Sequence, residues 1–238
     1  MKYLIIPDIH LKYERAERII SYEAADQIIF LGDYFDDFGD SVEITVNTAK
    51  WLKQSLTYPN RIHLIGNHDA HYMFPTRYYD CSGWEYDKMV AIKNELTISD
   101  FKQLKLYHYD ESLNVLYTHA GLTQTLVNNR WKGGTVLEWF KNECKNAIDE
   151  SWIGIKANYL LKAGKSRGGL EKSGGITWCD LSEFVPVKNL NQIFGHTPIT
   201  IPYEIRTDST YNICLDTHLN HYLIIDNSVR YIKEYAQL

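Results

Sequence analysis

The chain has 238 residues, and its 25 Lys and Arg against 30 Asp and Glu give a formal net charge of -5. This length suits one large domain, so we expect residues 1–238 to form a single domain with an ample core. The acidic balance argues against a protein built around a nucleic-acid backbone. No apolar run approaches the roughly 20 residues that span a bilayer. We therefore expect a cytoplasmic protein without a membrane or nucleic-acid partner, whereas its oligomeric state stays open.

Short hydrophobic runs, typical of strands, alternate along the chain with segments whose apolar residues recur at helical spacing, and turn residues separate them. The predicted helix after the second strand begins at Asp40-Ser41-Val42-Glu43, and Asp226-Asn227-Ser228 predicts a hairpin turn between the last two strands. In chain order, the pattern predicts a strand at 3–7, a helix at 14–20, a strand at 27–31, a helix at 40–56, a strand at 61–65, helices at 86–94 and 98–104, a strand at 114–118, a helix at 134–147, and strands at 192–194, 212–215, 221–226 and 229–235.

Two stretches interrupt this alternation. Residues 72–107 are rich in aromatic side chains, and residues 132–175 end in a basic, glycine-rich segment at 162–175. Such a glycine-rich segment resists regular structure. We expect both stretches to be cap-like insertions beside a cleft, with the glycine-rich segment near the substrate.

Five predicted strands are followed at once by Asp, Asn or His. In an open α/β sheet, ligands bind in the crevice beyond the carboxyl ends of the strands, so these side chains are expected to converge on one polar site. Such a site indicates a metal-dependent hydrolase. The strand endings carry Asp8 and His10, Asp33, Asn67 with His68 and Asp69, His119, and His196.

The order of these motifs resembles that of the calcineurin-like metallophosphoesterases. The Ala-Gly-Leu after His119 and the Thr-Pro after His196 most resemble the motifs of the phosphoprotein phosphatase branch. This branch includes bacterial and phage Ser/Thr phosphatases and diadenosine tetraphosphatases. The resemblance implies a four-layer α-β-β-α sandwich with two mixed β-sheets. The motifs are Asp8-x-His10, Gly32-Asp33-x-x-Asp36, Gly66-Asn67-His68-Asp69, His119-Ala120-Gly121-Leu122 and Gly195-His196-Thr197-Pro198.

The same resemblance implies two divalent metal ions bridged by Asp33. Imidazole, carboxylate and amide ligands together favour Mn, Fe, Zn or Co over Mg, and we expect Mn to serve in vitro. Two cations that share a carboxylate lower the pKa of a bridging water, so hydroxide exists at neutral pH. The implied ligands are Asp8, His10 and Asp33 for the first ion, and Asp33, Asn67, His119 and His196 for the second.

The resemblance also implies catalytic roles for His68 and Asp36. His68 would act as general acid on the leaving oxygen, with Asp36 as the carboxylate that orients its imidazole. The expected reaction is attack of the metal-bridging hydroxide on a phosphomonoester, either a phosphoprotein or a small phosphorylated compound. The alternative is a nucleotide pyrophosphatase or phosphodiesterase, of the diadenosine tetraphosphatase or cyclic nucleotide type. A binding module with a relict metal site is a third hypothesis, which the complete ligand set disfavours.

One position departs from the family pattern. Asp37 stands where phosphoprotein phosphatases usually carry an Arg that contacts phosphate. An additional carboxylate there repels a dianionic substrate unless a cation compensates for it. Arg167, in the glycine-rich segment, and Arg77 are the candidates to bind the phosphate instead, with Arg167 preferred, because a guanidinium binds its oxygens bidentately. A plain surface position is the alternative for either.

Some polar residues near the motifs stay unassigned. His71 either touches the substrate or supports the ligands, and the role of Asp216 is open. The other histidines, His218 among them, are interpreted as structural. The four cysteines are widely spaced, so we expect free thiols rather than disulfides.

Overall fold

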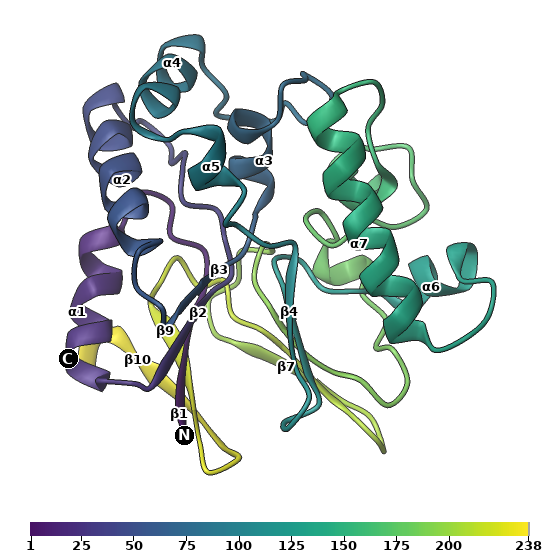
Figure 1. Ribbon diagram of the computed structural model, residues 1–238. Coiled ribbons are helices and arrows are strands. Elements are labelled where there is room, and N and C mark those ends of the chain that lie inside the picture. The colour runs from purple at the N-terminus through teal and green to yellow at the C-terminus, as the bar shows by residue number, and fades with distance from the viewer. Residues whose placement is uncertain (238) are drawn as a thin grey trace.

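The computed structural model describes residues 1–237, and most of the predicted elements are confirmed in it (Figure 1). The strands are β1 (Lys2–Ile6), β2 (Gln27–Phe30), β3 (Arg61–His63), β4 (Tyr107–Asp110), β5 (Val115–Thr118), β6 (Asn191–Phe194), β7 (Tyr203–Arg206), β8 (Tyr211–Cys214), β9 (His221–Asp226) and β10 (Val229–Glu234). The α-helices are α1 (Tyr13–Glu23), α2 (Val42–Ser55), α3 (Asn67–Met73), α4 (Tyr86–Glu95), α5 (Ile98–Phe101), α6 (Gln124–Arg130) and α7 (Val136–Ile153).

The strands form two five-stranded mixed sheets. The first has the order β10-β9-β1-β2-β3 and the second the order β4-β5-β6-β8-β7. In the first sheet β1, β2 and β3 run parallel, and in the second β5, β6 and β8 do so. The remaining strands, β4, β7, β9 and β10, pair antiparallel with their neighbours. Each sheet therefore has a parallel core of three strands, whose carboxyl ends lie at one edge.

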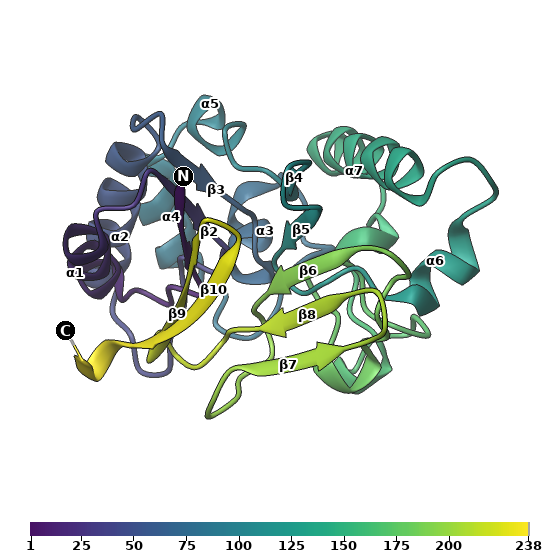
Figure 2. The ribbon, with the colours of Figure 1, turned by 90° about the horizontal axis from the view of Figure 1, so that it is seen from below.

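Side chains alternate between the two faces of each strand, and this alternation builds the layers. In β1, Ile5 packs in the cluster between the sheets, whereas Leu4 and Ile6 pack in the cluster that includes residues of α1 and α2. Helices α1 and α2 lie on one outer side and α7 lies on the other, with the strands between them (Figures 1 and 2). The predicted four-layer sandwich is confirmed. The cluster between the sheets consists of Ile5, Ile29, Leu31, Leu64, Val115, Tyr117, Ile193, Ile213, Leu215, Leu223 and Ile225.

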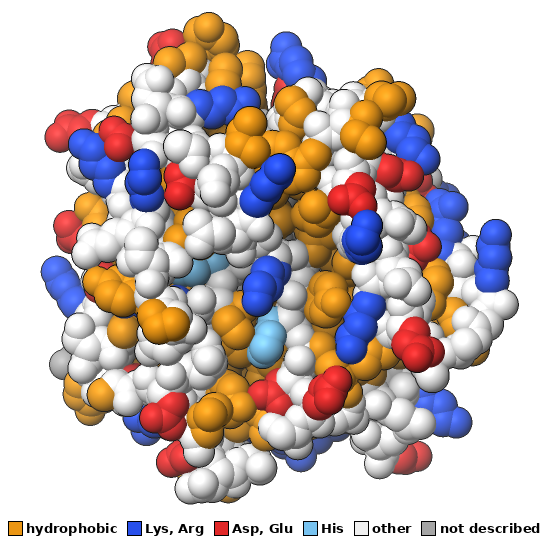
Figure 3. Space-filling view, in the orientation of Figure 1, with side chains coloured by type: hydrophobic (Ala, Val, Ile, Leu, Met, Phe, Trp, Pro, Cys, Tyr) orange, Lys and Arg blue, Asp and Glu red, His pale blue; other side chains and the backbone are white. Residues whose placement is uncertain are grey.

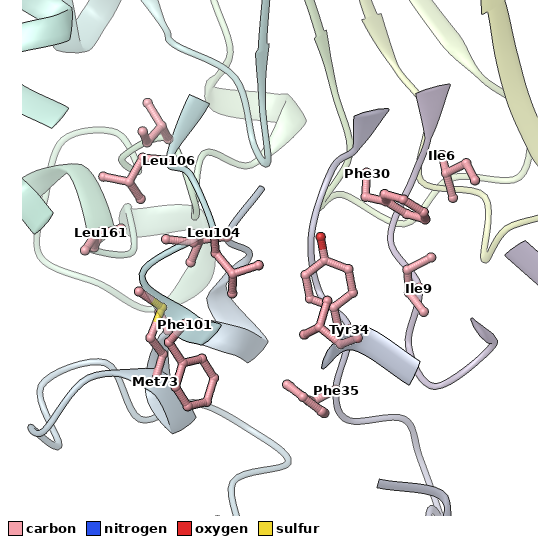
Figure 4. Close-up of a cluster of buried hydrophobic side chains, with 14 of the residues drawn as sticks. Ile6, Ile9, Phe30, Tyr34, Phe35, Met73, Phe101, Leu104, Leu106 and Leu161 are labelled. Atoms are coloured by element: carbon pink, nitrogen blue, oxygen red, sulfur yellow. The ribbon is translucent and has the colours of Figure 1, made fainter. Parts of the chain in front are cut away.

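The larger hydrophobic cluster lies outside the sheets and supports the loops that follow the strands. Phe30, at the end of β2, and Tyr34 and Phe35, in the loop after it, are fully buried in this cluster. Figure 4 shows these side chains on one side of the cluster, opposite Phe101 and Leu104. Burial of side chains of this size contributes roughly 1.5–3 kcal/mol each. The strand-end loops therefore rest on a packed core.

Two turn predictions are confirmed in detail. The hydroxyl of Ser41 accepts a hydrogen bond from the backbone N–H of Ile44, so Ser41 is the N-cap of α2. Asn227 and Ser228 have φ values of 46° and 65°, as a tight hairpin turn between β9 and β10 requires.

Strands β4 and β7 and helices α3 and α6 were not predicted. Both strands lie at an edge of the second sheet and pair with a single neighbour. In β7 no side chain is fully buried, and in β4 all four are only half-buried. Edge strands of this kind lack the continuous apolar run by which a buried strand is detected. These two segments become strands because they pair with β5 and β8.

The two stretches expected to be caps differ from each other. Residues 72–107 contain α4 and α5, beside α2 and α3. Residues 132–175 contain α7, which packs against the second sheet through Phe140 and Tyr107, whose rings lie 5.1 Å apart. Much of this second stretch is thus an outer layer of the sandwich. Within residues 1–237, none of the helices combines the length and apolarity needed to cross a membrane.

The glycine-rich segment is folded tightly rather than extended. It contains a 3-10 helix at Lys165–Arg167 and a bridge between Gly164 and Glu171. A Cβ added at Gly169 would lie 2.0 Å from the carbonyl oxygen of Ala163, so the backbone passes too close for any other residue. Regular structure is scarce there, as predicted, but the glycines serve close backbone packing.

Candidate metal and active site

All six parallel strands deliver a polar side chain to one cluster at the carboxyl edge of the sheets, and part of this cluster opens into a cleft. In the view of Figure 3, histidine side chains reach the surface near the middle of the face, between basic and hydrophobic side chains. The sixth strand, β8, delivers Asp216, whose role the sequence left open. The cleft is lined by His10, Asp33, Asp36, Asp37, Phe38, Asn67, His68, Ser82, Gly83, Arg167, Trp178, His196, Pro198 and His218.

Asp33 lies at the centre of the cluster formed by the expected metal ligands. Its Oδ2 is 3.7 Å from Nε2 of His10 and 3.3 Å from Nε2 of His119. Nε2 of His119 is also 3.1 Å from Oδ1 of Asn67 and 3.9 Å from Oδ2 of Asp8. The rings of His119 and His196 are 5.1 Å apart between centroids. The structure thus brings all six residues together.

Hydrogen bonds orient the histidines of this cluster. Nδ1 of His10 lies 2.7 Å from the carbonyl oxygen of Asp36, and Nδ1 of His119 lies 2.9 Å from that of Leu31. Because a carbonyl only accepts, both Nδ1 atoms carry a proton, which leaves Nε2 as the nitrogen that each neutral ring could offer to a cation. Nε2 of His196 is buried and has no hydrogen-bond partner. Three imidazole nitrogens therefore suit metal coordination.

The backbone around the cluster is strained and crowded. His10, Asp33, Asp36 and His196 have φ values of 41°, 50°, 62° and 68°, a left-handed region that such residues rarely adopt. A Cβ added at Gly195 would lie 1.9 Å from Oδ1 of Asp8. The loops therefore hold the carboxylates in contact with glycine backbone, and the packing around the loops must maintain these backbone conformations.

The charges of the cluster fit a bound cation. Asp8, Asp33 and Asp216 are each at most 2% exposed, and Oδ2 of Asp216 has no hydrogen-bond partner. Burial, followed by the charge of Asp216, raises the pKa of Asp8 well above its ordinary value. Buried carboxylates this close repel each other unless positive charge lies between them. The donor set of carboxylates, imidazoles and one amide therefore fits divalent cations.

Asp69, which the sequence did not single out as a support, joins two of the strand-end loops. Its carboxylate accepts backbone N–H hydrogen bonds from Asp33 at 2.9 Å, Tyr34 at 2.8 Å and Gly66 at 2.8 Å. Burial and the nearby charge of Asp33 raise its pKa to about 7. Asp69 thereby fixes the loop after β2 to the start of α3, where Asn67 begins the helix.

His68 and Asp36 form the pair expected from the motifs. Nδ1 of His68 donates to Oδ2 of Asp36 at 3.0 Å, and Oδ1 of Asp36 accepts from the Tyr72 hydroxyl at 2.7 Å. Nζ of Lys88 is 3.4 Å from the same carboxylate, and Nε2 of His71 is 2.9 Å away. Burial alone would raise the pKa of Asp36, but the neighbouring imidazoles of His68 and His71 hold it well below its ordinary value. Asp36 is therefore an anion that orients His68.

The two arginine candidates lie in different places. Arg167 lines the cleft, and its Nε is 2.7 Å from Oδ2 of Asp180. The side chain of Arg77 is 78% exposed, pairs with Asp80 and does not line the cleft, so it lies at the surface. The charge of Asp37 is paired with Nζ of Lys12, 2.7 Å from its Oδ2.

Several residues of the cleft were missed or left unassigned from the sequence. Trp178, Phe38 and His218 line it, although His218 was interpreted as structural. His71 and Lys88 belong to the surroundings of Asp36 rather than to the expected ligand cluster. The spacing of His71 three residues after His68 on α3 was a usable signal, because residues three apart share a helix face. No comparable signal exists for Lys88, which arrives from α4.

Solved structures with a similar fold include phosphatases. A cold-active protein-tyrosine phosphatase from a psychrophilic Shewanella sp. is 16% identical, with a TM-score of 0.64 and coverage of 100% of this chain and 78% of that chain. A putative diadenosine tetraphosphatase is 15% identical, with a TM-score of 0.53 and coverage of 98% and 93%. A protein serine/threonine phosphatase from Saccharomyces cerevisiae is 14% identical, with a TM-score of 0.50 and coverage of 98% and 79%. At these identities the likeness concerns the fold alone.

No curated protein matches the chain significantly. Residues 1–200, however, match the family model described as calcineurin-like phosphoesterase. This range contains every strand-end residue of the ligand cluster, from Asp8 to His196. Its match, taken with a two-sheet sandwich whose strand ends converge on carboxylates and imidazoles, means that the chain belongs to the calcineurin-like phosphoesterase family, whose members are metal-dependent phosphoester hydrolases.

Proposed function

We propose that the protein hydrolyses phosphate monoesters, either phosphoproteins or small phosphorylated compounds, with two divalent ions in the cleft. Two groups of residues close enough to ligate an ion, one with His10 and one with His119, share the carboxylate of Asp33. This shared carboxylate is the observation that carries the proposal, because two neighbouring cations need a common anionic ligand. Asp8, His10 and Asp33 would hold one ion, and Asp33, Asn67, His119 and His196 the other.

The identity of the ions follows from the donor set. Mixed imidazole, carboxylate and amide ligation favours Mn, Fe, Zn or Co. When bound, such ions polarise phosphoryl oxygens and lower the pKa of water. Every other part of the proposed reaction belongs to side chains of the chain itself.

His68 is proposed as the general acid. Its Nδ1–H donates to Asp36, so Nε2 is the atom left to deliver a proton to the leaving oxygen. Asp36 keeps this ring oriented and favours its charged form. The backbone N–H of His68 also donates to Oδ1 of Asp33 at 2.9 Å, which ties the acid to the shared carboxylate. Orientation of this kind is what second carboxylates supply to catalytic histidines.

Arg167 is proposed to bind the phosphate oxygens in place of the arginine that Asp37 replaces. It lines the cleft, and only 28% of its side chain is exposed. Its partner Asp180 leaves other guanidinium N–H groups to face the substrate. Lys12 neutralises Asp37, so this carboxylate repels a phosphate dianion less than an unpaired one would.

The proposal is tested with the Mn-loaded protein on p-nitrophenyl phosphate and bis(p-nitrophenyl) phosphate. We expect chelator-sensitive turnover that is faster on the monoester. Faster hydrolysis of the diester would instead favour the phosphodiesterase alternative. Metal binding without turnover of any phosphopeptide, dinucleotide or cyclic nucleotide would refute the enzymatic proposal.

His68→Asn separates the proposed acid from the metal ligands. A substrate with an unactivated alkyl leaving group should lose about 10²–10⁴-fold in kcat, because such an oxygen needs protonation. The loss should be smaller on p-nitrophenyl phosphate, whose leaving group is stable as an anion. Unchanged metal content must accompany both results. Intact turnover of the alkyl ester would contradict the role of His68.

A further inference from the structure

A third group of potential metal ligands lies beside the proposed active site. It consists of His68, His71 and Cys81, whose ligand atoms all lie within 4.8 Å of one another. His71 is buried, whereas His68 and Cys81 are half-buried. His68 faces the cleft that Ser82 and Gly83 also line, so an ion has a route to the group from solvent.

The distances within this group suit a tetrahedral ion. Sγ of Cys81 lies 3.3 Å from Nδ1 of His71 and 3.9 Å from Nδ1 of His68. Ligands of a tetrahedral zinc ion lie roughly 3.3–3.6 Å apart, given the usual Zn–N and Zn–S bond lengths. A shift of a few tenths of an ångström in the His68 ring would bring its Nδ1 within that distance of Sγ of Cys81. A thiolate and two imidazoles are also donors that zinc prefers.

The surroundings of His71 favour coordination through Nδ1. Its Nε2 lies 2.9 Å from Oδ2 of Asp36 but forms no well-aligned hydrogen bond there. The backbone N–H of Cys81 donates to Nδ1 at 3.4 Å, so Nδ1 carries the lone pair and Nε2 the proton. A carboxylate beside the far nitrogen of a ligating histidine is the usual outer support of a zinc site. Asp36 would supply that support.

We propose that His68, His71 and Cys81 form an inhibitory site for Zn²⁺, separate from the proposed ligands of the two catalytic ions. Binding forms one Zn–S and two Zn–N bonds and releases to solvent the protons of the Cys81 thiol and of Nδ1 of His68. The hydrogen bonds from His68 to Asp36 and from the backbone N–H of Cys81 to Nδ1 of His71 are then lost. Zinc in place of the Nδ1 proton leaves the His68 ring as a neutral imidazole that keeps its Nε2 proton, so it no longer donates that proton to a leaving group as the imidazolium does.

Cobalt provides a test of the site that does not depend on catalysis. Co²⁺ bound to a thiolate shows a charge-transfer absorption in the near ultraviolet, and the six proposed catalytic ligands include no sulfur. We expect this band in Co²⁺-loaded wild type and in Cys144→Ala, a buried cysteine outside the group, but not in Cys81→Ala. Absence of the band from the wild type, or its persistence in Cys81→Ala, would overturn the site. Far-ultraviolet circular dichroism checks that the variants are folded.

Inhibition by zinc is measured on the Mn-loaded protein, with metal content determined at each point. Only this part rests on the proposed function. We expect turnover to fall as a third ion binds, and the half-inhibitory zinc concentration to rise roughly tenfold or more in Cys81→Ala, since even an outer support is worth that much. Equal inhibition of wild type and Cys81→Ala would refute inhibition through this site. A protein without phosphatase activity that still shows the cobalt band would refute the proposed function and leave the site intact.

Discussion

Gly66→Ala is expected to damage the proposed metal centre through a single methyl group. Gly66 is the N-cap of α3 and has a φ of -94° and a ψ of 177°, which any residue adopts without strain. Backbone conformation therefore gives no reason to require glycine here. An added Cβ would, however, lie 2.0 Å from Oδ1 of Asp33 and 2.5 Å from its backbone nitrogen. The carboxylate that we propose as the shared ligand occupies the space of the missing side chain.

The size of the effect follows from that distance. Real Cβ contacts are not shorter than 3.0 Å, so Asp33 or the start of α3 must move by about 1 Å. A misplacement of that size costs about 100-fold in rate when it affects catalytic geometry, or about 2.7 kcal/mol in transition-state free energy. Overpacking should also lower the free energy of unfolding by about 1–3 kcal/mol. Metal affinity should fall, because a carboxylate displaced by 1 Å no longer reaches both ions.

The assay compares Gly66→Ala with Gly134→Ala. Gly134 has a φ of +81° and open space around it, so alanine there costs about 1–2 kcal/mol of strain and touches nothing at the site. We expect the two variants to lose comparable stability by denaturant unfolding. Only Gly66→Ala should lose bound metal, measured by elemental analysis, and kcat/KM on p-nitrophenyl phosphate. If Gly66→Ala retained two ions per chain and wild-type turnover, the close approach of Asp33 to this backbone would have no functional meaning.

Three further predictions address phosphate binding, the loop brace and a buried histidine. Arg167→Ala should raise KM for p-nitrophenyl phosphate about tenfold or more with metal content unchanged, whereas Arg77→Ala should leave the kinetics unaltered. Equal effects of the two substitutions would disprove the assignment of Arg167 as the phosphate-binding residue. Asp69→Ala leaves three buried backbone N–H groups without an acceptor and should lower the unfolding free energy of the metal-free protein by about 3 kcal/mol or more. Asp100→Ala, which removes the half-buried carboxylate that accepts the backbone N–H of the N-cap residue Thr97, should cost only about 1 kcal/mol. Burial and the charge of Arg61 lower the pKa of His63 to about 3, so below pH 6.5 the unfolded chain takes up a proton that the folded protein does not. As the pH falls from 6.5 to 3, the unfolding free energy should therefore fall by up to about 1.4 kcal/mol per pH unit. His63→Gln should remove this part of the pH dependence.

The sequence by itself was sufficient to predict the layered α/β fold and to identify the residues at the strand ends. Strands β1 and β2 are short, continuously apolar runs, and such runs are read directly because both of their faces are buried. Asp8, Asp33 and His119 were found because each follows such a run at once. The rule that parallel strands present their carboxyl ends to one edge then predicted that they meet.

Only the tertiary structure decided what surrounds these residues. Lys88 contacts Asp36 across 52 residues of sequence, and Asp216 joins the carboxylates of the cluster from the sixth parallel strand. The sequence offered both Arg167 and Arg77 as candidates, with Arg167 preferred, and their actual difference depends on how the segment 162–175 packs beside the cleft. Edge strands β4 and β7 likewise form through their partners. The physical reason is the same throughout: local patterns record which face of a strand or helix is buried, whereas contacts between distant loops depend on how the two sheets pack together.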